Sequence, residues 1–254
     1  MKTLFILLFV LPITTLANNK SICGFDDRVP SKNPKVARAL KSLTSRNGCT
    51  VTMISNSCAI SVGHCKKDLK IIEFNTPEST KEGIQHPSPM DIYYVNQESL
   101  VYKNNGPGDD WAVMKVENNE FTNYAPGEVQ GHYKVASEMP EPGAFIKITG
   151  YGYDDEFEKN FAQQTNIGEL KSYGAQERYR NLPGLISHKV DTMGGNSGSS
   201  IVEAKNNQVI GVHSHGGCNM SHYSNTMNKG TSIILNEEFN KAVKECLDSE
   251  KEED

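Results

Sequence analysis

Three side chains of this 254-residue chain could together perform nucleophilic chemistry: His64, Asp110 and Ser197. A serine hydroxyl is a weak nucleophile, so it needs a histidine to accept its proton and a carboxylate to orient that histidine. Gly195 and Gly198 flank Ser197, and glycine permits the tight turn that aims successive backbone N–H groups at one point. Turns of this composition also occur without any activity, so the hypothesis depends on the histidine and the carboxylate.

Short runs typical of β-strands, separated by turns, must position these side chains. Examples are 50–54, 71–74, 92–95, 112–116, 144–149, 200–203, 209–213 and 231–234. Turn-forming pairs such as Asn47-Gly48 and Pro142-Gly143 lie between them. Many short strands without alternating helices predict an all-β sandwich or barrel. One helix is expected over 236–247, where apolar residues recur at a period of 3.6 and Asn236 can cap the first turn.

The composition excludes several classes of protein. The chain has 26 basic and 31 acidic residues of interspersed sign, so no basic surface for a nucleic-acid backbone is expected. With 37% hydrophobic residues the chain can bury a core and does not resemble a disordered segment. Beyond the N-terminal run described next, no stretch is long and apolar enough to span a bilayer. We expect a monomer without nucleic-acid or membrane partners.

The first 17 residues are expected to be a secretory signal peptide. Lys2 precedes the apolar run Leu4–Leu11, and Thr15-Leu16-Ala17 offers small residues for cleavage. As a helix this run would rise only ~12 Å, against a hydrocarbon core of ~30 Å. The six cysteines all follow the signal, and an even number in an exported chain favours disulfides over metal thiolates. We therefore expect a secreted or periplasmic protein.

In their order and context, the three segments resemble the chymotrypsin-like (trypsin-fold) serine endopeptidases. His64 is followed by Cys65, and Cys49 lies sixteen residues before that cysteine, which resembles the family's histidine and its disulfide loop. Asp110 precedes an apolar strand and Ser197 lies in a glycine-rich loop, as in the family. The resemblance implies two six-stranded antiparallel β-barrels with a C-terminal α-helix, and a Cys49–Cys65 disulfide.

The resemblance spans roughly residues 25–247 and implies divisions of the chain. These are a signal peptide at 1–17, an N-terminal arm or propeptide at 18–34, a protease domain at 35–247 and an acidic tail at 248–254. Within the protease domain, lobes of about 35–125 and 126–235 precede the helix at 236–247. The family's active site lies in the cleft between two such lobes.

The resemblance also implies roles for individual residues. Ser197 would attack a peptide carbonyl, His64 would accept its proton, and Asp110 would orient the imidazole. The N–H groups of Gly195 and Ser197 would form the oxyanion hole. Polypeptides would be the substrates, and neither a metal nor an organic cofactor is required. Asp109 is a competing candidate for the carboxylate, but alignment to the apolar strand that follows favours Asp110.

Variations in the nucleophile loop favour one branch of the family. Asn196 occupies the position at which animal trypsin-like enzymes carry an aspartate that pairs with a new amino terminus. A neutral asparagine cannot form that charge-assisted pair, so activation should not depend on it. Asn196–Ser199, Cys23–Arg28 and Asp110–Lys115 resemble the bacterial glutamyl-endopeptidase branch instead.

Two interpretations of substrate specificity remain open. Asp191, six residues before Ser197, has the position of the pocket floor in trypsin-like enzymes, which implies cleavage after Arg or Lys. In the glutamyl branch, His213 and Thr192 match the histidine and the hydroxyl that bind a substrate carboxylate, which implies cleavage after Glu. A carboxylate at position 191 that faced the pocket would repel a Glu side chain, so the two interpretations exclude each other. We favour cleavage after Glu.

Further alternatives concern the cysteines, a metal site and the activity itself. Four cysteines outside the implied disulfide allow three pairings, and pairing Cys23 with Cys246 would tie the arm to the last helix. A zinc site at His213, His215, Cys218 and His222 is disfavoured, because pocket and disulfide roles account for these residues and no metal is expected. A protease fold without activity, acting as a binding module, is the rival function.

Overall fold

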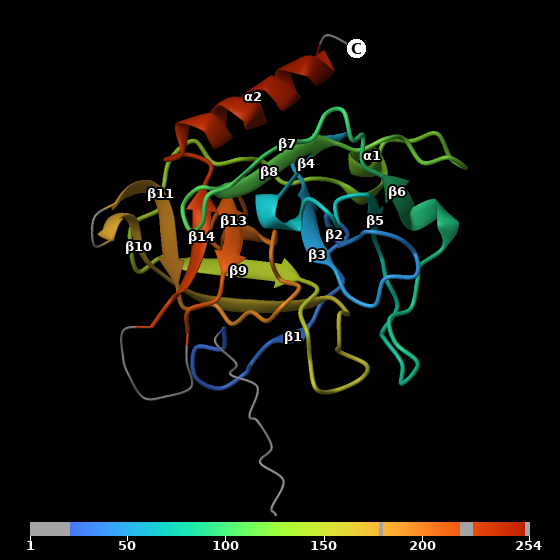
Figure 1. Ribbon diagram of the computed structural model, residues 1–254, viewed down its shortest axis with the longest axis horizontal. Helices are drawn as coiled ribbons and strands as arrows, with labels where there is room; N and C mark the ends of the chain where they lie inside the picture. The colour runs from blue at the N-terminus through green and yellow to red at the C-terminus, as the bar shows by residue number, and fades with distance from the viewer. Residues whose placement is uncertain (1–20, 178–179, 219–225, 252–254) are drawn as a thin grey trace, which may run out of the picture.

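The computed structural model describes residues 21–177, 180–218 and 226–251, and it consists of two antiparallel β-sheets and a long C-terminal helix (Figure 1). The first sheet has the strand order β6-β5-β2-β3-β4-β8-β7. Its strands are β2 (Val36–Leu40), β3 (Cys49–Met53), β4 (Cys58–Ser61), β5 (Ile71–Glu73), β6 (Ile92–Tyr94), β7 (Val101–Asn104) and β8 (Asp110–Lys115). Every residue of β2, β3 and β4 is buried, so the sheet curls around its own core.

The second sheet has the order β1-β10-β11-β14-β13-β12-β9, and β9 also pairs with β10. Its strands are β1 (Val29–Pro30), β9 (Phe145–Gly150), β10 (Gln164–Glu177), β11 (Arg180–His188), β12 (Ser200–Glu203), β13 (Val209–His215) and β14 (Asn228–Ser232). The extra pairing closes six strands into a barrel and leaves β1 as an added edge strand.

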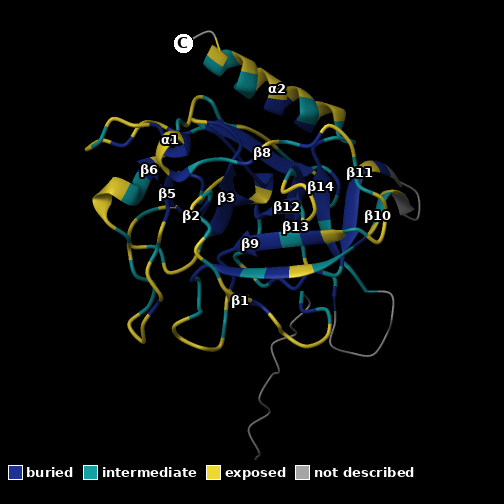
Figure 2. Ribbon diagram, turned by 180° about the vertical axis from the view of Figure 1, so that it is seen from behind, coloured by how far each residue is buried: buried dark blue, intermediate teal, exposed yellow. Residues whose placement is uncertain are grey.

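The predicted all-β, two-barrel fold with a C-terminal helix is confirmed. The count of six strands describes the closed barrel of the second lobe. The first sheet has seven strands, and within the described residues its end strands β6 and β7 do not pair with each other. Figure 2 shows that buried residues follow the strands of both lobes, whereas exposed residues follow the loops and the outer face of the helix.

The C-terminal helix α2 (Glu237–Lys251) lies against β8 of the first sheet (Figure 1). Asn236 is its N-cap as predicted, because its Oδ1 accepts a hydrogen bond from the Phe239 N–H at 3.0 Å. The helix continues four residues beyond the predicted end at 247, into the expected acidic tail. The physical reason is Glu250, whose carboxylate accepts hydrogen bonds from the Ser57 N–H at 2.6 Å and the Ser55 hydroxyl at 2.7 Å.

Three short helices lie in the connections between the strands. They are η1 (Gly63–Cys65), η2 (Pro89–Asp91) and α1 (Pro126–Gln130). η1 carries His64, and α1 lies in the connection between the two lobes. The described residues include no helix both long and apolar enough to cross a membrane. The predicted signal peptide at 1–17 lies outside the described residues.

Three disulfides join all six cysteines. Cys49–Cys65 is present, as the family resemblance implied. The pairing of Cys23 with Cys246 is wrong, because Cys246 bonds to Cys58 of β4 and Cys23 bonds to Cys218. Since α2 packs on the first sheet, its cysteine meets β4, whereas the N-terminal arm runs along the second sheet.

Candidate active site

His64 and Asp110 are in direct contact, although 46 residues separate them in the chain. The Nδ1 atom of His64 lies 2.6 Å from the Oδ2 atom of Asp110, and the backbone N–H of His64 donates to Oδ1 at 3.1 Å. The Asp110 side chain is fully buried, whereas that of His64 is one-third exposed. The carboxylate therefore holds His64 at its ring and at its backbone, and the rest of the ring remains accessible.

The neighbouring carboxylate, Asp109, has a different environment. Its Oδ1 accepts hydrogen bonds from Trp111 Nε1 at 3.2 Å and from Asn236 Nδ2 at 3.1 Å. Asp110 is held across the lobes, because its backbone N–H donates to the Thr231 hydroxyl at 3.2 Å and its carbonyl accepts from it at 2.9 Å. Of the two candidate carboxylates, only Asp110 bonds to His64 among the described residues.

Ser197 lies in a loop that is attached to the first sheet beside His64. The Thr50 N–H donates to the Ser197 carbonyl at 2.9 Å, and the same oxygen lies 4.0 Å from Sγ of Cys65, the residue after His64. The Cys49–Cys65 disulfide fixes that neighbour. The Ser197 side chain is half-buried, and its hydroxyl forms no hydrogen bond with a described residue. The nucleophile loop and the His64 turn therefore adjoin at the junction of the two lobes.

Gly195 has a backbone conformation that favours glycine, with a φ of 104°. A Cβ atom added there would lie 2.3 Å from the Tyr151 carbonyl oxygen. The Tyr153 N–H donates to the carbonyl of Gly194 at 2.7 Å, which fixes the peptide plane between Gly194 and Gly195. In a trans peptide the C=O and N–H groups point in opposite directions, so the Gly195 N–H points away from Tyr153. It donates no hydrogen bond within the described part of the chain.

The peptide plane before Ser197 is fixed in the same manner. The Asn196 carbonyl accepts a hydrogen bond from the Ser199 N–H at 3.0 Å, so the N–H of Ser197 points the opposite way and has no described acceptor. The Asn196 side chain is buried, and its Oδ1 accepts from the Met193 N–H at 3.1 Å. Asn196 thus stabilises its own loop by this hydrogen bond.

Comparison with known proteins agrees with this geometry. The family model described as Trypsin matches residues 28–234, which is most of the chain and includes His64, Asp110 and Ser197. The chain belongs to the trypsin family. It is a serine endopeptidase of that family, with polypeptides as substrates.

Solved structures of serine proteases share the fold of this trypsin-family chain. A structure of a Glu endopeptidase in complex with MPD has a TM-score of 0.63 at 21% identity, covering 89% of this chain and 98% of that chain. A thermostable serine protease from an extremophilic microorganism has a TM-score of 0.59 at 12% identity, covering 84% and 96%. No curated protein matches the chain significantly.

A buried pair of histidines lies beside the nucleophile loop of this trypsin-family protein. Nε2 of His188 lies 3.2 Å from Nδ1 of His213, and the His213 carbonyl accepts from the Gly198 N–H at 2.9 Å. Burial lowers the pKa of His188 to about 3, so its ring is neutral at neutral pH. Burial, followed by the neighbouring His188, His215 and His64, lowers the pKa of His213 well below its usual range.

Hydrogen bonds fix the tautomers of both rings. The Val190 N–H donates to Nδ1 of His188 at 3.2 Å, so the neutral ring carries its proton on Nε2. That proton is donated to Nδ1 of His213, which leaves the His213 proton on its own Nε2. His213 is thereby a neutral hydrogen-bond donor. His188 was not among the predicted site residues, because no local motif marks it. The one available signal was that His188, like His213, is a histidine near the end of a strand.

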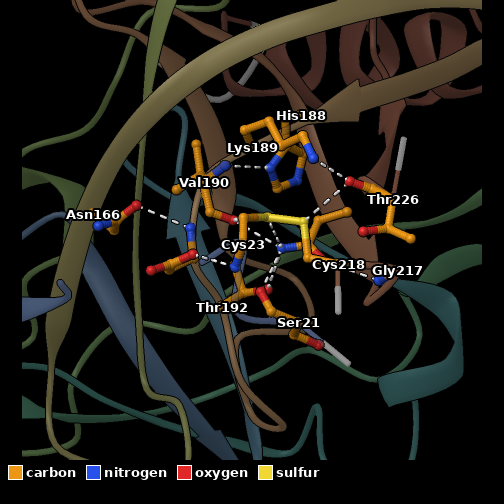
Figure 3. Close-up of a disulfide and its surroundings, with 12 residues drawn as sticks. Ser21, Cys23, Asn166, His188, Lys189, Val190, Thr192, Gly217, Cys218 and Thr226 are labelled. Atoms are coloured by element: carbon orange, nitrogen blue, oxygen red, sulfur yellow. Dashed lines mark hydrogen bonds between the residues drawn. A yellow bond between two sulfur atoms is a disulfide. The ribbon is translucent and has the colours of Figure 1, made fainter. Parts of the chain in front are cut away.

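Asp191 and Thr192 are neighbours in the chain, and the contacts of Asp191 differ from those expected for a trypsin-like pocket. Oδ1 of Asp191 accepts from the Cys23 N–H at 2.6 Å, and Oδ2 accepts from the Asp27 N–H at 3.4 Å. Burial raises the pKa of Asp191 to about 6, although these hydrogen bonds oppose the shift. The Asp191 carboxylate therefore binds the backbone of the N-terminal arm. The Thr192 hydroxyl accepts from Asn228 Nδ2 at 3.3 Å and keeps its own proton to donate (Figure 3).

His215 is a third histidine near the site. Its Nδ1 lies 3.9 Å from Oδ2 of Asp110, and its ring centroid lies 5.7 Å from that of His64. Burial lowers the pKa of His215, and the nearby Asp110 partly opposes this shift. In the described residues no group of three or more His, Cys, Asp or Glu side chains could hold a metal ion. Of the disfavoured zinc cluster, Cys218 is in a disulfide and His222 lies outside the described residues.

Proposed function

We propose that Ser197, His64 and Asp110 form the catalytic triad and hydrolyse peptide bonds through an acyl-enzyme. The observation that carries the proposal is the 2.6 Å contact between Nδ1 of His64 and a fully buried Asp110 carboxylate. It leaves Nε2 of the ring to act as the base, beside the loop that carries the Ser197 hydroxyl. The N–H groups of Gly195 and Ser197, which donate to no described residue, support an oxyanion hole next to that hydroxyl.

The chemistry follows from these positions. Oγ of Ser197 attacks the peptide carbonyl while its proton passes to Nε2 of His64, and the carbonyl oxygen becomes an oxyanion that the two N–H groups stabilise. The C–N bond then breaks, and His64 gives the proton to the leaving amine. Water attacks the resulting ester, transferring a proton to His64. The C–O bond to Ser197 breaks and the serine recovers its proton from His64.

A fluorophosphonate probe tests this proposal against the rival of an inactive binding module. We expect the wild-type protein to be labelled once, at Ser197, and to hydrolyse a denatured protein. Ser197→Ala should lose both properties, and His64→Ala should lose nearly all labelling because the hydroxyl then has no base. Ser199→Ala is the matched control, a neighbouring serine whose loss should leave labelling in place. An unlabelled, folded wild-type protein would favour the binding module.

We propose in addition that the enzyme cleaves after Glu. The neutral His213 ring, with its proton held on Nε2 by the His188 pair, and the Thr192 hydroxyl are two donors suited to a carboxylate. The Arg/Lys alternative requires a free carboxylate at position 191. Both oxygens of Asp191 accept hydrogen bonds from the N-terminal arm, which disfavours that alternative.

Matched peptides that differ only in the residue before the scissile bond test the specificity. We expect kcat/KM to be highest for Glu, with Arg and Phe at least about tenfold lower. His213→Gln should reduce the ratio of Glu to Phe cleavage, whereas Asp191→Asn should not lower the ratio of Glu to Arg. A wild-type preference for Arg that disappears in Asp191→Asn would establish the alternative instead.

We propose that the enzyme is exported. The three disulfides and the absence of a free cysteine in the described residues favour an oxidising compartment. N-terminal sequencing of the protein recovered from the periplasm and from the medium would test the predicted cleavage after residue 17. An uncleaved protein retained in the cytoplasm with six reduced thiols would contradict export.

A further inference from the structure

Arg28 lies behind the nucleophile loop, in residues 21–28, the part of the predicted arm at 18–34 that is described and precedes β1. These eight residues are called the N-terminal arm below. Its side chain is only 4% exposed. Nε and Nη2 donate to the two carboxylate oxygens of Asp26 at 2.9 and 2.7 Å, and Nη2 also lies 3.3 Å from Oδ2 of Asp154. Burial alone would raise the pKa of Asp26, but its hydrogen bonds and charge contact with Arg28 lower the pKa overall. The guanidinium is therefore fixed in one orientation.

From this position Arg28 reaches the oxyanion loop through a single residue. Its Nη1 donates to the carbonyl of Tyr153 at 3.1 Å. The N–H of the same tyrosine donates to the Gly194 carbonyl at 2.7 Å. That second hydrogen bond sets the plane of the Gly194–Gly195 peptide, whose other end is the N–H proposed to stabilise the oxyanion. Two consecutive hydrogen bonds thus connect Arg28, through Tyr153, to the Gly194–Gly195 peptide.

Gly152 is closely packed between Arg28 and the loop that carries Ser197. A Cβ atom added to Gly152 would lie 2.0 Å from Oδ1 of Asn196 and 2.9 Å from Nη1 of Arg28. The Gly152 carbonyl accepts a hydrogen bond from the Phe161 N–H at 2.9 Å, so the N–H on the other side of that peptide, which belongs to Tyr153, points the opposite way. The peptide before Tyr153 is therefore held from both sides.

The arm that carries Arg28 is also attached at its other end. Cys23 forms the disulfide with Cys218, and its N–H donates to Oδ1 of Asp191 at 2.6 Å (Figure 3). The Ser21 carbonyl accepts from the Thr192 N–H at 3.2 Å. Residues 21–28 thus contact the specificity region at one end and the rear of the oxyanion loop at the other.

We propose that Arg28 is a positioning residue for the oxyanion hole, and that the N-terminal arm is an integral part of the active enzyme, not a removable propeptide. This inference rests on the proposed function of Ser197 and adds the device that orients its oxyanion donor. Without the guanidinium, the Tyr153 carbonyl loses a charge-assisted donor and the segment is free to shift. The Gly194–Gly195 peptide can then rotate, which turns its carbonyl and not its N–H toward the oxyanion.

Arg28→Gln tests the proposal, with Arg46→Gln as the matched control because Arg46 is exposed and distant in sequence. Loss of a complete oxyanion donor costs about 10²–10³ in kcat, so misorientation of one should lower kcat by about 10- to 100-fold. KM should stay within about twofold, because the Michaelis complex carries no oxyanion. Arg46→Gln should match the wild type, and Arg28→Lys should recover part of the loss because it restores the charge without the bidentate pair.

A second measurement separates positioning from simple loss of structure. A peptide aldehyde with the residue that the wild type prefers forms a tetrahedral adduct with an oxyanion, whereas the product peptide acid does not. Aldehyde affinity should fall in Arg28→Gln by the same factor as kcat, with product affinity unchanged, when both are normalised to the fraction of protein that a fluorophosphonate can titrate.

Three outcomes would overturn the inference. They are an unchanged kcat in folded Arg28→Gln, an equal loss of aldehyde and product affinity, and full activity after removal of residues 21–28. If Arg28→Gln is unfolded at the assay temperature, Arg28→Lys provides the same comparison. A wild-type protein that neither hydrolyses peptides nor is labelled at Ser197 would contradict the proposed function instead, which keeps the two failures distinguishable.

Discussion

The two halves of the proposed site are held in place by different means. On the first sheet, His64 is positioned by direct side-chain contact at 2.6 Å with the fully buried carboxylate of Asp110. On the second, the groups around Ser197 are backbone N–H donors, whose directions are set by hydrogen bonds on the opposite side of their peptides. A side-chain pair can be broken by changing one residue, whereas a peptide orientation depends on everything packed behind it. Substitutions far from the substrate should therefore lower activity when they disturb the packing behind the second half.

The largest expected loss of kcat comes from a substitution in the first half of the site. Asp110→Asn should lower kcat by about 10⁴-fold, because the amide can donate to Nδ1 and so favours the wrong tautomer of His64. Asp109→Asn is the matched control and should stay within a few-fold of the wild type. Steady-state kinetics on one peptide substrate measures both. Equal losses in the two variants would contradict the role of Asp110 as the carboxylate that orients His64.

A substitution at the oxyanion loop should have the next largest effect. Gly195→Ala should lower kcat by about 10²–10³-fold, because the added methyl group meets the Tyr151 carbonyl and forces the peptide to rotate. Gly143→Ala controls for backbone strain alone, since Gly143 also has a positive φ but has open space around its Cβ position. If Gly143→Ala loses as much activity, strain and not the oxyanion donor explains the result.

A smaller effect is expected from the contact that supports the same loop from the first sheet. The buried Thr50 hydroxyl donates to the Gly195 carbonyl at 2.9 Å and accepts from the Tyr151 N–H at 3.1 Å. Thr50→Val removes both hydrogen bonds at nearly constant volume, so kcat should fall by about tenfold. Thr52→Val, which loses a buried hydroxyl contact to Ser200 at 3.1 Å, should lower the melting temperature without a comparable loss of kcat.

The smallest expected effect concerns stability and its dependence on pH. The folded-state pKa of Asp191 is raised to about 6, so the ionised form is disfavoured in the folded protein, and stability is lost as pH rises from about 4 through 6. Asp191→Asn removes this penalty and keeps an acceptor for the Cys23 N–H. At pH 8 the variant should gain at most about 3 kcal/mol, and at pH 4 almost nothing. Thermal unfolding at both pH values measures the difference; an equal shift at both would contradict the titration of Asp191.

The sequence predicts strands well where apolar residues recur. It predicts them poorly where a strand is held by hydrogen bonds to neighbouring strands that are distant in the chain. β12 was predicted with its observed bounds, because apolar residues mark it. β10 is not among the predicted examples, since Gln164–Glu177 is a largely polar run, and neither is β11, which contains Pro183, a residue that argues against a strand from sequence alone. The strand β2 is not among them either, and its Arg38, a residue type usually exposed, forms a buried ion pair with Glu73.

The candidate site shows the same division. His64 and Ser197 were predicted from local motifs, since a histidine before cysteine and a glycine-flanked serine are recognisable in isolation. Cys23–Arg28 was noted only for its resemblance to one branch of the family. The contacts of Arg28 with Tyr153 and of His188 with His213 join residues more than 20 positions apart, so no local pattern could assign a role to either residue. The hydrogen bond from the Cys23 N–H to the Asp191 carboxylate likewise depends on the Cys23–Cys218 disulfide, a pairing that the sequence left open.

A protease in solution is exposed to its own activity, and cleavage usually begins where chain segments fray. Both the first and the last described segments are secured by covalent cross-links to the body of the fold, through Cys23–Cys218 and Cys58–Cys246. A nick in the exposed stretch between Gly24 and Asp27 would therefore leave the severed piece tethered. This enzyme should tolerate self-digestion under oxidising conditions and be consumed by it once a reductant opens those two bonds.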